Sequence, residues 1–371
     1  MVGERRAATH CVGQWFAVKV GISMVALAAE RTTGLERYSI ELVRALRELD
    51  PPGFDLIVYA PAWAERLLGD CVVPPRALPR PLVLETWLPA VARRDRLDLL
   101  HTTAFAPGAM GRTPVVLTLH DLVPWEMPET MSRGQRMYFR PAQERLLRSS
   151  RLRGVVTDAE CTADDIRRRF QWHGPTVSAA VGLGQSWTPA PRAPGRPASR
   201  RTVDLLTVGT LEPRKGLHVV ERCLAVLKER GVEVRWSLVG RRGWGTPPPD
   251  GIVELGSLSD VELLHAYRTA DALVAPSLLE GFDLPVLEAL ACGTPVVASD
   301  IAVHREHFGK VARLARAGDA EDTAEQILTA LTSDGGVAAR EARVQHAQGF
   351  TWRRTAEAVV QSWQSAVTPE R

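Results

Sequence analysis

The chain of 371 residues is 45% hydrophobic and 24% charged, which suits two ordinary globular domains and excludes disordered and collagen-like proteins. A formal net charge of +3 gives no reason to expect a nucleic-acid partner, and no apolar run approaches the roughly 18 residues that span a bilayer. Five scattered cysteines, none in a Cys-x-x-Cys pair, argue against a zinc site or a disulfide framework, so we expect a cytoplasmic protein.

Residues 1–15 carry charge without periodicity, and we interpret them as a flexible tail. Over residues 16–186, apolar runs of strand length alternate with helical or irregular segments, as in a parallel sheet covered on both faces. Directly after Gly34 a helix is expected, because apolar residues recur there at three- and four-residue steps. The expected strands lie in FAVKVGISMVAL, FDLIVYA, LDLLHTT, TPVVLTLHD and LRGVVTDA. Residues 16–186 are therefore predicted to form a Rossmann-like domain.

A segment rich in proline, arginine and small residues, 187–202, has little that could pack, and we interpret it as a linker. The alternation of strands and helices restarts over residues 203–351, which predicts a second Rossmann-like domain. A last helix is expected at residues 352–367, and since no strand follows it we expect it to return to the first domain. The predicted fold class is α/β, with two doubly wound domains facing a cleft. Ligands of such sheets collect beyond the carboxyl ends of the strands.

The first candidate site follows the first strand of the second domain, in VGTLEPRKGL at residues 208–217. The strand runs through Gly209 into a loop that carries Arg214 and Lys215 just before a helix. Backbone N–H groups at the start of a helix and two cations suit an anion, with a phosphate as the first choice. A solvated basic turn is the alternative, because the spacing does not match a Walker loop.

The second candidate site is LLEGFDLPVLEALACGTPVVAS at residues 278–299. Glu280 lies in the loop before a helix whose first turn contains Pro285, and Glu288 lies about one turn inside that helix. Two carboxylates about 5 to 9.5 Å apart would suit a glycosidase. Exposed amides that meet phosphate, with each carboxylate accepting hydrogen bonds from sugar hydroxyls, fit the local structure better and describe a nucleotide-sugar site. A loop acid and a solvated helix acid without function are the other alternative.

Four stretches of the sequence resemble the signature blocks of glycosyltransferase family 4: GTLEPRKG, EGFDLPVLEALACGTPVVAS, LTLHD and GLERYSIELVRAL. The likeness extends over roughly residues 18–365. It implies the GT-B fold and a retaining transferase. The pattern with Glu-Pro-Arg-Lys after the glycine is closest to mannosyl- and rhamnosyltransferases of bacterial polysaccharide assembly.

The resemblance also implies roles for single residues. Arg214 and Lys215 match residues that bind the pyrophosphate of the donor and stabilise it as it leaves. Glu288 matches the glutamate that binds the ribose hydroxyls, and Glu280 matches the acid beside the transferred sugar. His120, after PVVLTL, matches a histidine near the reaction centre, although a lone histidine after a strand is also common as a structural hydrogen-bonding residue.

The implied catalytic set is thus His120, Arg214, Lys215 and Glu280. The implied donor-binding set adds the loop amides, the ribose glutamate and two glycines, of which the first lets the backbone approach the phosphates: Gly34, Gly209, Gly281, Phe282, Asp283, Leu284 and Glu288.

The sequence departs from the family pattern in four places. Asp283 stands where many members have a second glycine, and because an acid is unfavourable beside a pyrophosphate we interpret it as a helix cap. The first loop, ERTTGLERY, lacks the usual run of glycines, and Ala159 stands where a serine is common. Further on, the stretch IAVHREHFGK retains Glu306 but differs from the family pattern at most other positions.

No Asp-x-Asp sequence is present to hold a divalent cation, so no metal and no other cofactor is predicted. Arg214, Lys215 and the helix N-terminus are expected to stabilise the leaving diphosphate instead. The expected reaction moves a hexose from a nucleotide-diphosphate sugar, with GDP-mannose favoured, to a hydroxyl of a saccharide, glycolipid or natural product. The alternatives are a nucleotide-sugar epimerase or hydrolase of the same architecture and a non-catalytic sugar-nucleotide binder.

Arginines are concentrated at residues 133–153, which suits weak peripheral contact with the inner face of the plasma membrane. A solvated helix face is the alternative. The expected partners are therefore the nucleotide-sugar donor and a saccharide, lipid-linked or small-molecule acceptor, with no nucleic acid.

Overall fold

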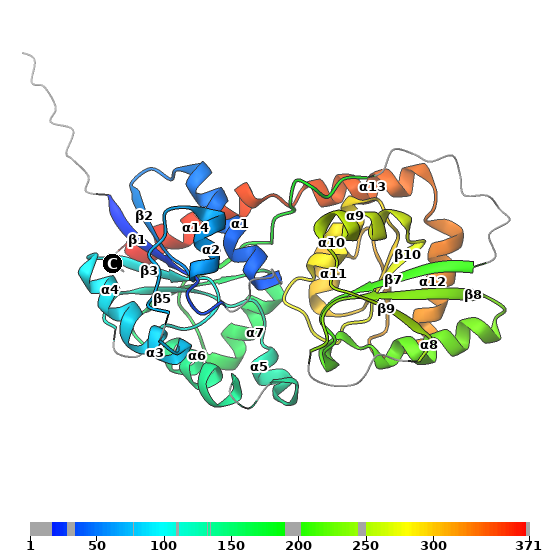
Figure 1. Cartoon of the computed structure of the whole chain (residues 1–371), viewed down its shortest axis with the longest axis horizontal. Helices are drawn as coiled ribbons and strands as arrows, with labels where there is room; N and C mark the ends of the chain where they lie inside the picture. The colour runs from blue at the N-terminus through cyan, green and yellow to red at the C-terminus, as the bar shows by residue number, and fades with distance from the viewer. Residues whose placement is uncertain are drawn as a thin grey trace, which may run out of the picture.

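The computed structural model of the protein consists of two lobes that lie side by side along its long axis (Figure 1). It describes residues 17–27, 34–76, 78–108, 111–131, 133, 135–189, 202–243 and 250–368. The tail predicted at residues 1–15, and all but the two ends of the linker predicted at 187–202, lie outside the described residues.

Six parallel strands form the sheet of the first lobe, in the order β2-β1-β3-β4-β5-β6. Helices cover both sides of such a sheet, so its central strands are buried on both faces. In β4, for example, Val115, Val116 and Leu117 are fully buried. The strands are β1 (Val18–Ser23), β2 (Phe54–Tyr59), β3 (Leu99–Thr102), β4 (Val115–Thr118), β5 (Leu152–Thr157) and β6 (Thr176–Ser178).

The first helix, α1 (Gly34–Leu49), buries one apolar face. Tyr38, Leu42 and Leu46, spaced four residues apart, are at most 2% exposed. The other helices of the lobe are α2 (Ala62–Leu68), α3 (Arg80–Leu82), α4 (Leu88–Arg94), α5 (Val123–Glu126), α6 (Arg140–Leu147) and α7 (Glu160–Phe170), with a 3₁₀ turn at Pro128–Thr130 and π-helical turns at Val83–Trp87 and Gln135–Phe139.

The sheet of the second lobe is also parallel and six-stranded, in the order β12-β11-β10-β7-β8-β9. Its strand order reverses between β7 and β10, the place where doubly wound sheets bind ligands. The strands are β7 (Thr202–Val208), β8 (Glu233–Val239), β9 (Ile252–Gly256), β10 (Ala272–Ala275), β11 (Val296–Ser299) and β12 (Arg313–Ala315). The helical elements are a 3₁₀ turn (Pro213–Lys215), α8 (His218–Glu229), α9 (Asp260–Thr269), α10 (Leu284–Ala291), α11 (Ala302–Phe308), α12 (Ala320–Ser333) and α13 (Val337–Gln348).

The last helix, α14 (Trp352–Val367), leaves the second lobe and packs on α1 and β5 of the first lobe (Figure 1). The hydroxyl of Thr351 caps its first turn by accepting from the amide of Arg354. Inside the first lobe, the indole N–H of Trp363 donates to Nδ1 of His101 at 3.0 Å, and both side chains are fully buried. The chain therefore completes its first lobe with its last helix.

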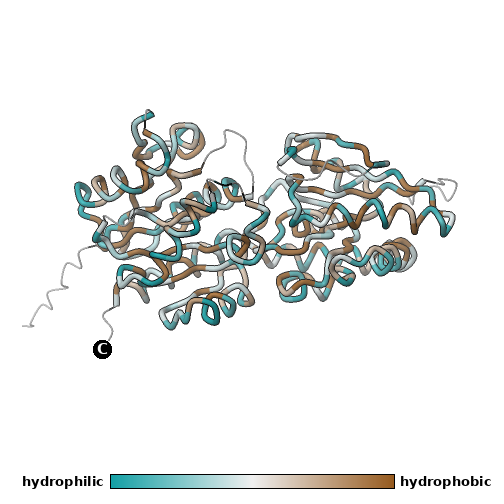
Figure 2. The backbone as a smooth tube through the Cα atoms, turned by 90° about the horizontal axis from the view of Figure 1, so that it is seen from below, coloured by the Kyte–Doolittle hydropathy of each residue, from teal (hydrophilic) through white to brown (hydrophobic). Residues whose placement is uncertain are grey.

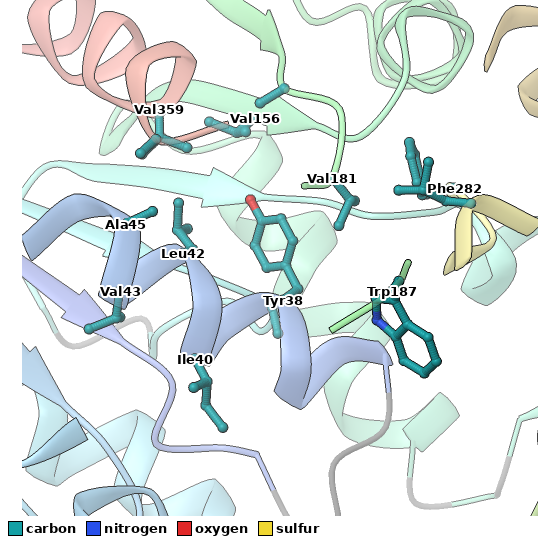
Figure 3. Packing of buried hydrophobic residues seen from close by; sticks show 14 of the residues in the cluster. Tyr38, Ile40, Leu42, Val43, Ala45, Val156, Val181, Trp187, Phe282 and Val359 are labelled. Atoms are coloured by element: carbon teal, nitrogen blue, oxygen red, sulfur yellow. The ribbon is translucent and has the colours of Figure 1, made fainter. Parts of the chain in front are cut away.

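The interior of each lobe is apolar, while the outer turns of many helices are hydrophilic (Figure 2). One cluster of buried hydrophobic residues continues from the first lobe into the second. It includes Tyr38 of α1, Trp187 after the first lobe, Phe282 of the second lobe and Val359 of α14 (Figure 3). The predicted α/β class with two doubly wound, Rossmann-like domains is confirmed. Within the described part of the chain, no helix combines the length and apolar character needed to cross a membrane.

Candidate nucleotide-sugar site

The loops that follow β7 and β10 lie next to each other, because these two strands pair where the strand order of the second sheet reverses. The amide of Leu278 in the second loop donates to the carbonyl oxygen of Arg214 in the first, at 2.7 Å. Gly216 permits this approach, since its φ is +65° and a Cβ there would overlap the carbonyl oxygen of Pro276. The two motifs identified in the sequence thus form one site.

Arg214 and Lys215 both point at Glu280. Nη1 of Arg214 lies 2.7 Å from Oε2 of Glu280, and Nζ of Lys215 lies 2.6 Å from Oε1. Nε of Arg214 also donates to Glu212 at 2.9 Å. The side chains of Lys215 and Glu280 are only 11% and 8% exposed, so water screens their interaction weakly.

Each charged group in this cluster favours the charged form of its neighbour of opposite sign. Burial acts to raise the pKa of Glu280, but Arg214 and Lys215 outweigh it and lower that pKa to about 2. Burial acts to lower the pKa of Lys215, but the carboxylates of Asp283 and Glu280 outweigh it and raise that pKa. Glu280 and Lys215 are therefore both charged at neutral pH.

Asp283 precedes α10 with a left-handed backbone, φ +80° and ψ 72°. The interpretation of this residue as a helix cap is wrong, because its side chain makes no hydrogen bond to the helix amides. Its Oδ1 lies 3.6 Å from Nζ of Lys215 and its Oδ2 lies 3.1 Å from Nε2 of His304. Glycine adopts a left-handed φ at the lowest cost, which gives a physical reason for the glycine that similar sequences have here.

Helix α10 begins directly after Asp283, with Pro285 in its first turn, where the missing N–H is not needed. The side chain of Phe282 turns away from Lys215 into an aromatic cluster with Phe308 and Phe350, and it is 4% exposed. Phe282 therefore has only its backbone to offer a ligand, as Gly281 does.

Glu288 lies one turn inside α10, and both of its oxygens are engaged. Arg37 of α1, in the first lobe, donates to Oε1 at 2.6 Å, and the hydroxyl of Tyr267 in α9 donates to Oε2 at 2.8 Å. Nη2 of Arg37 also binds Asp260 at the start of α9, at 2.6 Å. Burial raises the pKa of Glu288 to about 7, although Arg37 acts in the opposite direction.

His120 follows β4 at the carboxyl end of the first sheet, and both of its ring nitrogens face oxygen acceptors. Nδ1 lies 2.7 Å from the carboxylate of Asp158, which follows β5, and Nε2 lies 2.8 Å from the carbonyl oxygen of Thr103, which follows β3. Neither an ionised carboxylate nor a carbonyl oxygen donates a proton, so both nitrogens of His120 carry one. Burial alone would lower the pKa of His120, but Asp158 outweighs it and raises that pKa.

The two lobes meet at His120. A Cβ on Gly281 would overlap the carbonyl oxygen of His120, so only glycine fits between them. The neighbouring Asp121 faces the charge of Arg214, which opposes the rise in the pKa of Asp121 that burial causes. His120 and the loop of Glu280 therefore lie on opposite sides of one interface.

Two further glycines of the candidate set are placed at close contacts. Gly34 is the first residue of α1, and a Cβ there would lie 3.6 Å from Cδ1 of Leu284 at the start of α10. Gly209 directly follows β7, with 3.0 Å between a Cβ there and Cε of Lys215. The structure thus gathers the whole candidate set around the N-terminal end of α10.

Sequence analysis missed four residues of this site: Arg37, Asp158, Tyr267 and His304. Asp158 directly follows a strand, and the rule that ligand groups follow strand ends could have identified it. Arg37 lies within the stretch GLERYSIELVRAL, but nothing in that stretch indicates a contact with Glu288, 251 residues further along. Tyr267 and His304 lie on helices, where no local pattern sets them apart.

The arrangement suits a ligand that carries both phosphate and hydroxyl groups. Arg214 and Lys215 are fixed cations beside the N-terminus of α10, and Glu280 and Glu288 present carboxylates that accept hydrogen bonds from hydroxyls. In the described part of the chain, no group of three or more His, Cys, Asp or Glu residues is arranged to hold a metal ion. The positive charge identified at this site comes from side chains.

Two family models match the chain, one in each lobe. The model described as Glycosyltransferase Family 4 matches residues 32–177, and the model described as Glycosyl transferases group 1 matches residues 202–333. The O-antigen chain mannosyltransferase B of Escherichia coli is 27% identical over 358 residues, which are 86% of this chain and 93% of the relative. The phosphatidyl-myo-inositol mannosyltransferase of Mycobacterium leprae is 28% identical over 334 residues, 81% of this chain and 84% of the relative.

Solved structures share the fold across nearly the whole chain. Sucrose-phosphate synthase from Thermosynechococcus elongatus superimposes with a TM-score of 0.69 at 18% identity, over 94% of this chain and 98% of that one. Alr3699/HepE from Anabaena, in complex with UDP-glucose, gives a TM-score of 0.68 at 18% identity, over 94% and 99%. With a family model in each lobe and two six-stranded parallel sheets, the chain belongs to the glycosyltransferases of family 4 and has the GT-B fold.

Proposed function

We propose that the protein transfers a hexose from a nucleotide-diphosphate sugar to an acceptor hydroxyl with retention of the anomeric configuration. The observation that carries this proposal is the convergence of Arg214 and Lys215 on Glu280 beside the N-terminus of α10, where the two lobes meet. This is a fixed positive site with a carboxylate at its centre. It suits a diphosphate whose sugar lies next to an acid.

The two cations account for leaving-group departure. When the bond from the anomeric carbon to the phosphate oxygen breaks, its electron pair stays on the diphosphate. Fixed positive charges placed where that negative charge develops lower the barrier. Arg214 and Lys215 are held by Glu280 and Glu212, so they are already oriented before the donor arrives. We therefore propose that turnover needs no metal ion, and activity retained in excess EDTA would support this.

Retention is supported by the state of His120. Both of its ring nitrogens carry protons, so it has no lone pair with which to deprotonate an acceptor. Glu280 is held between two cations and has a pKa of about 2, which makes it a weak nucleophile. In the proposed step the acceptor oxygen bonds to the anomeric carbon on the face that the diphosphate leaves. The acceptor's proton passes to a phosphate oxygen.

Glu288 is the proposed ligand of the ribose hydroxyls. Its carboxylate lies one turn from the N-terminus of α10, and Tyr267 fixes its orientation through a buried hydrogen bond of 2.8 Å. A nucleotide whose phosphates lie beside Lys215 would then place its ribose further along α10. Donor contacts would come mainly from the second lobe.

GDP-mannose is the proposed donor. The support is that two relatives matched over most of their length are named as mannosyltransferases. One structural neighbour is in complex with UDP-glucose, so the base and the sugar need a direct test. Thermal-shift titration with equal concentrations of GDP-, UDP-, ADP- and dTDP-sugars separates these donors, because at one concentration the ligand that binds the folded state more tightly stabilises it more. We expect the largest shift with GDP-mannose.

The acceptor is proposed to be a saccharide, a lipid-linked sugar or a small molecule, reached from the first lobe. Peripheral membrane contact is supported by an exposed apolar pair on this lobe, Met137 at 80% and Leu82 at 46% exposure. The hydroxyl of Tyr138 binds the carbonyl oxygen of Pro81 at 3.2 Å, which joins their two segments, and the adjacent Arg136 is exposed. Sedimentation with anionic vesicles, reversed by salt and absent with neutral vesicles, would support this contact.

The decisive experiment measures release of nucleoside diphosphate with and without a sugar acceptor, followed by NMR of the anomeric configuration of the product. Acceptor-dependent release with retained configuration supports the proposal. Release without any acceptor would indicate a hydrolase, and a change in the donor sugar without release would indicate an epimerase. An inverted product, or a glycosyl adduct trapped on Glu280, would contradict the retaining mechanism.

A further inference from the structure

Among the polar contacts that join the lobes, two lie on either side of the site. We call the first the Arg37 bridge: Arg37 of the first lobe binds Glu288 and Asp260 of the second, at 2.6 Å each. In the second, the Glu306 cap, the carboxylate of Glu306 in α11 accepts the amides of Glu160 and Cys161 at the start of α7, at 2.7 and 2.9 Å. Only the Arg37 bridge uses a residue that the donor is proposed to need.

In the Arg37 bridge, both carboxylate oxygens of Glu288 already have a hydrogen-bond donor. Arg37 occupies one oxygen of its carboxylate and Tyr267 occupies the other, and the side chain of Glu288 is 5% exposed. The guanidinium of Arg37 lies 5.4 Å from the ring centre of Trp187, whose side chain is 4% exposed. Ribose hydroxyls that approach Glu288 from between the lobes therefore meet the Arg37 guanidinium first.

We infer that Arg37 occupies the place of the donor's ribose on Glu288, and that donor binding exchanges one for the other. This inference rests on the proposed ribose-binding role of Glu288. The side chain of Asp260 is 62% exposed and binds the other end of the guanidinium, so it keeps Arg37 close after the exchange. Arg37 then acts as a competitor built into the chain, one that holds the lobes together while the donor is absent.

The exchange has a thermodynamic signature. A ligand that must break the contact between Arg37 and Glu288 binds more weakly by the free energy of that contact, and deleting Arg37 restores the difference. A nucleotide without ribose hydroxyls cannot replace Arg37 on Glu288, so its affinity does not depend on Arg37. The inference therefore predicts that the side chain of Arg37 and the two ribose hydroxyls compete for Glu288.

The test is calorimetric titration of wild type and Arg37→Ala with GDP and UDP, and with their 2′,3′-dideoxy analogues. Titrations at pH 8.5 keep Glu288 of the wild type ionised, since its pKa is about 7. We expect Arg37→Ala to bind the ribonucleotide about tenfold more tightly than wild type does, and to bind the dideoxy analogue within about twofold of wild type. Weaker binding of the ribonucleotide, or equal changes for both ligands, would overturn the inference.

Two further variants make the result specific. Arg37→Gln removes the charge but keeps a side chain of similar length, and must change affinity in the same direction as Arg37→Ala. Glu306→Ala breaks a different contact between the lobes and must not change the ratio of the two affinities. A shifted ratio would show that the antagonism comes from loosening the lobes and would overturn the exchange.

Glu288→Ala separates this inference from the proposed function. If Arg37→Ala does not distinguish the ribonucleotide from its dideoxy analogue, or if Arg37→Ala with Glu288→Ala distinguishes them as well as Arg37→Ala alone does, Glu288 is not the ribose ligand and both proposals are wrong. If the distinction needs Glu288 but is the same with and without Arg37, the donor site stands and only the exchange is wrong.

Discussion

The two lobes share a doubly wound architecture but differ in the loops at the carboxyl ends of their strands. In the second lobe, the loops at the reversal of strand order carry Arg214, Lys215, Glu280 and Asp283, which a chain of ion pairs connects: Arg214 with Glu280, Glu280 with Lys215, and Lys215 with Asp283. In the first lobe, the polar groups that face this interface are fewer and more separate: His120 with Asp158, and Arg37. The difference teaches that a fold repeated twice in one chain does not divide the chemistry equally. The second lobe holds the charge cluster, and the first lobe contributes Arg37, Asp121 and His120 from across the interface.

The charge cluster of the second lobe is an unusual thing for a protein to bury. Removing ions from water costs free energy that their attraction recovers only when the geometry is favourable, so buried ion pairs seldom explain stability. One carboxylate and two cations that are buried together at the end of a sheet, each with a shifted pKa, therefore indicate a binding site. These are Arg214, Lys215 and Glu280.

The largest expected effect is a difference in kcat between a variant of the second lobe and a variant of the first. Lys215→Ala removes a charge from the proposed diphosphate site and should lower kcat by about 10² to 10³-fold. Asp158→Asn removes only the negative charge beside His120. Asp158 touches no proposed phosphate, so this variant should lower kcat by about tenfold or less. The measurement is nucleoside diphosphate release under saturating donor and acceptor.

A matched control for Lys215 is Lys228→Ala, which removes an exposed lysine near the end of α8 and should leave kcat unchanged. Thermal unfolding of each variant checks that the fold is retained. Equal losses for Lys215→Ala and Asp158→Asn would break the comparison, because the first lobe would then carry as much of the catalysis as the second.

The next effect concerns stability and pH. The pKa of Glu288 is about 7 in the folded protein against an ordinary 4.5, so between these values the folded state holds a proton that the unfolded chain has lost. Its contribution to stability is fully present below pH 4.5 and is lost as the pH rises through 7. Between pH 5 and pH 8 the free energy of unfolding should fall by roughly 2 to 3 kcal/mol through this residue.

Urea unfolding at several pH values measures this effect, and Glu288→Gln, which does not titrate, should show a flatter dependence. Glu280 should behave in the opposite way. Its pKa is lowered to about 2, so its contribution is present above pH 4.5 and is lost as the pH falls toward 2. If wild type and Glu288→Gln had the same pH dependence, the two glutamates of α10 and its loop would not differ as the structure implies.

A smaller effect tests the backbone of Asp283. Because its φ is +80°, Asp283→Gly should be more stable than Asp283→Ala by about 1 kcal/mol, although both variants lose the contacts to Lys215 and His304. Comparing two variants that lack the same side chain isolates the conformational cost. Urea unfolding measures the difference, and an alanine variant at least as stable as the glycine variant would contradict the left-handed conformation.

The smallest effect concerns the Glu306 cap. Glu306→Gln keeps an oxygen acceptor for only one of the two amides, of Glu160 and Cys161, and removes the negative charge at the start of α7. The expected loss of stability is about 0.5 to 1 kcal/mol, typical of a charge beside a helix N-terminus and one exposed hydrogen bond. Amide hydrogen exchange at residues 160 and 161 is the direct measurement. Unchanged protection of both amides would show that Glu306 leaves the first lobe in solution.

Much of the fold can be predicted from local pattern. The apolar runs of β4, β7 and β10 are buried on both faces, and such runs are typical of parallel strands covered by helices. The positions of Arg214, Lys215 and Glu280 are predictable as well, because loops at the carboxyl ends of adjacent strands must meet. Proline in the first turn of α10 placed the start of that helix within one residue.

The rest depends on contacts that no local pattern contains. Arg37 and Glu288 are 251 residues apart and meet only because the lobes dock. The interpretation of Asp283 failed because capping was inferred from residue type, whereas its left-handed backbone directs the carboxylate toward Lys215 and His304. The short β6 and β12, at the sheet edges, have three residues each and give too weak a pattern to be predicted.

The position of α14 has a consequence for synthesis. The second lobe is complete by the end of α13, but the face of the first lobe made by α1 and β5 stays uncovered until residues 352–367 leave the ribosome. During translation the domain that emerges first is thus finished last, and a chain cut short before residue 352 would expose apolar surface on an otherwise assembled lobe. A nonsense mutation between the codons for α13 and those for α14 would be expected to cause aggregation or degradation of the product.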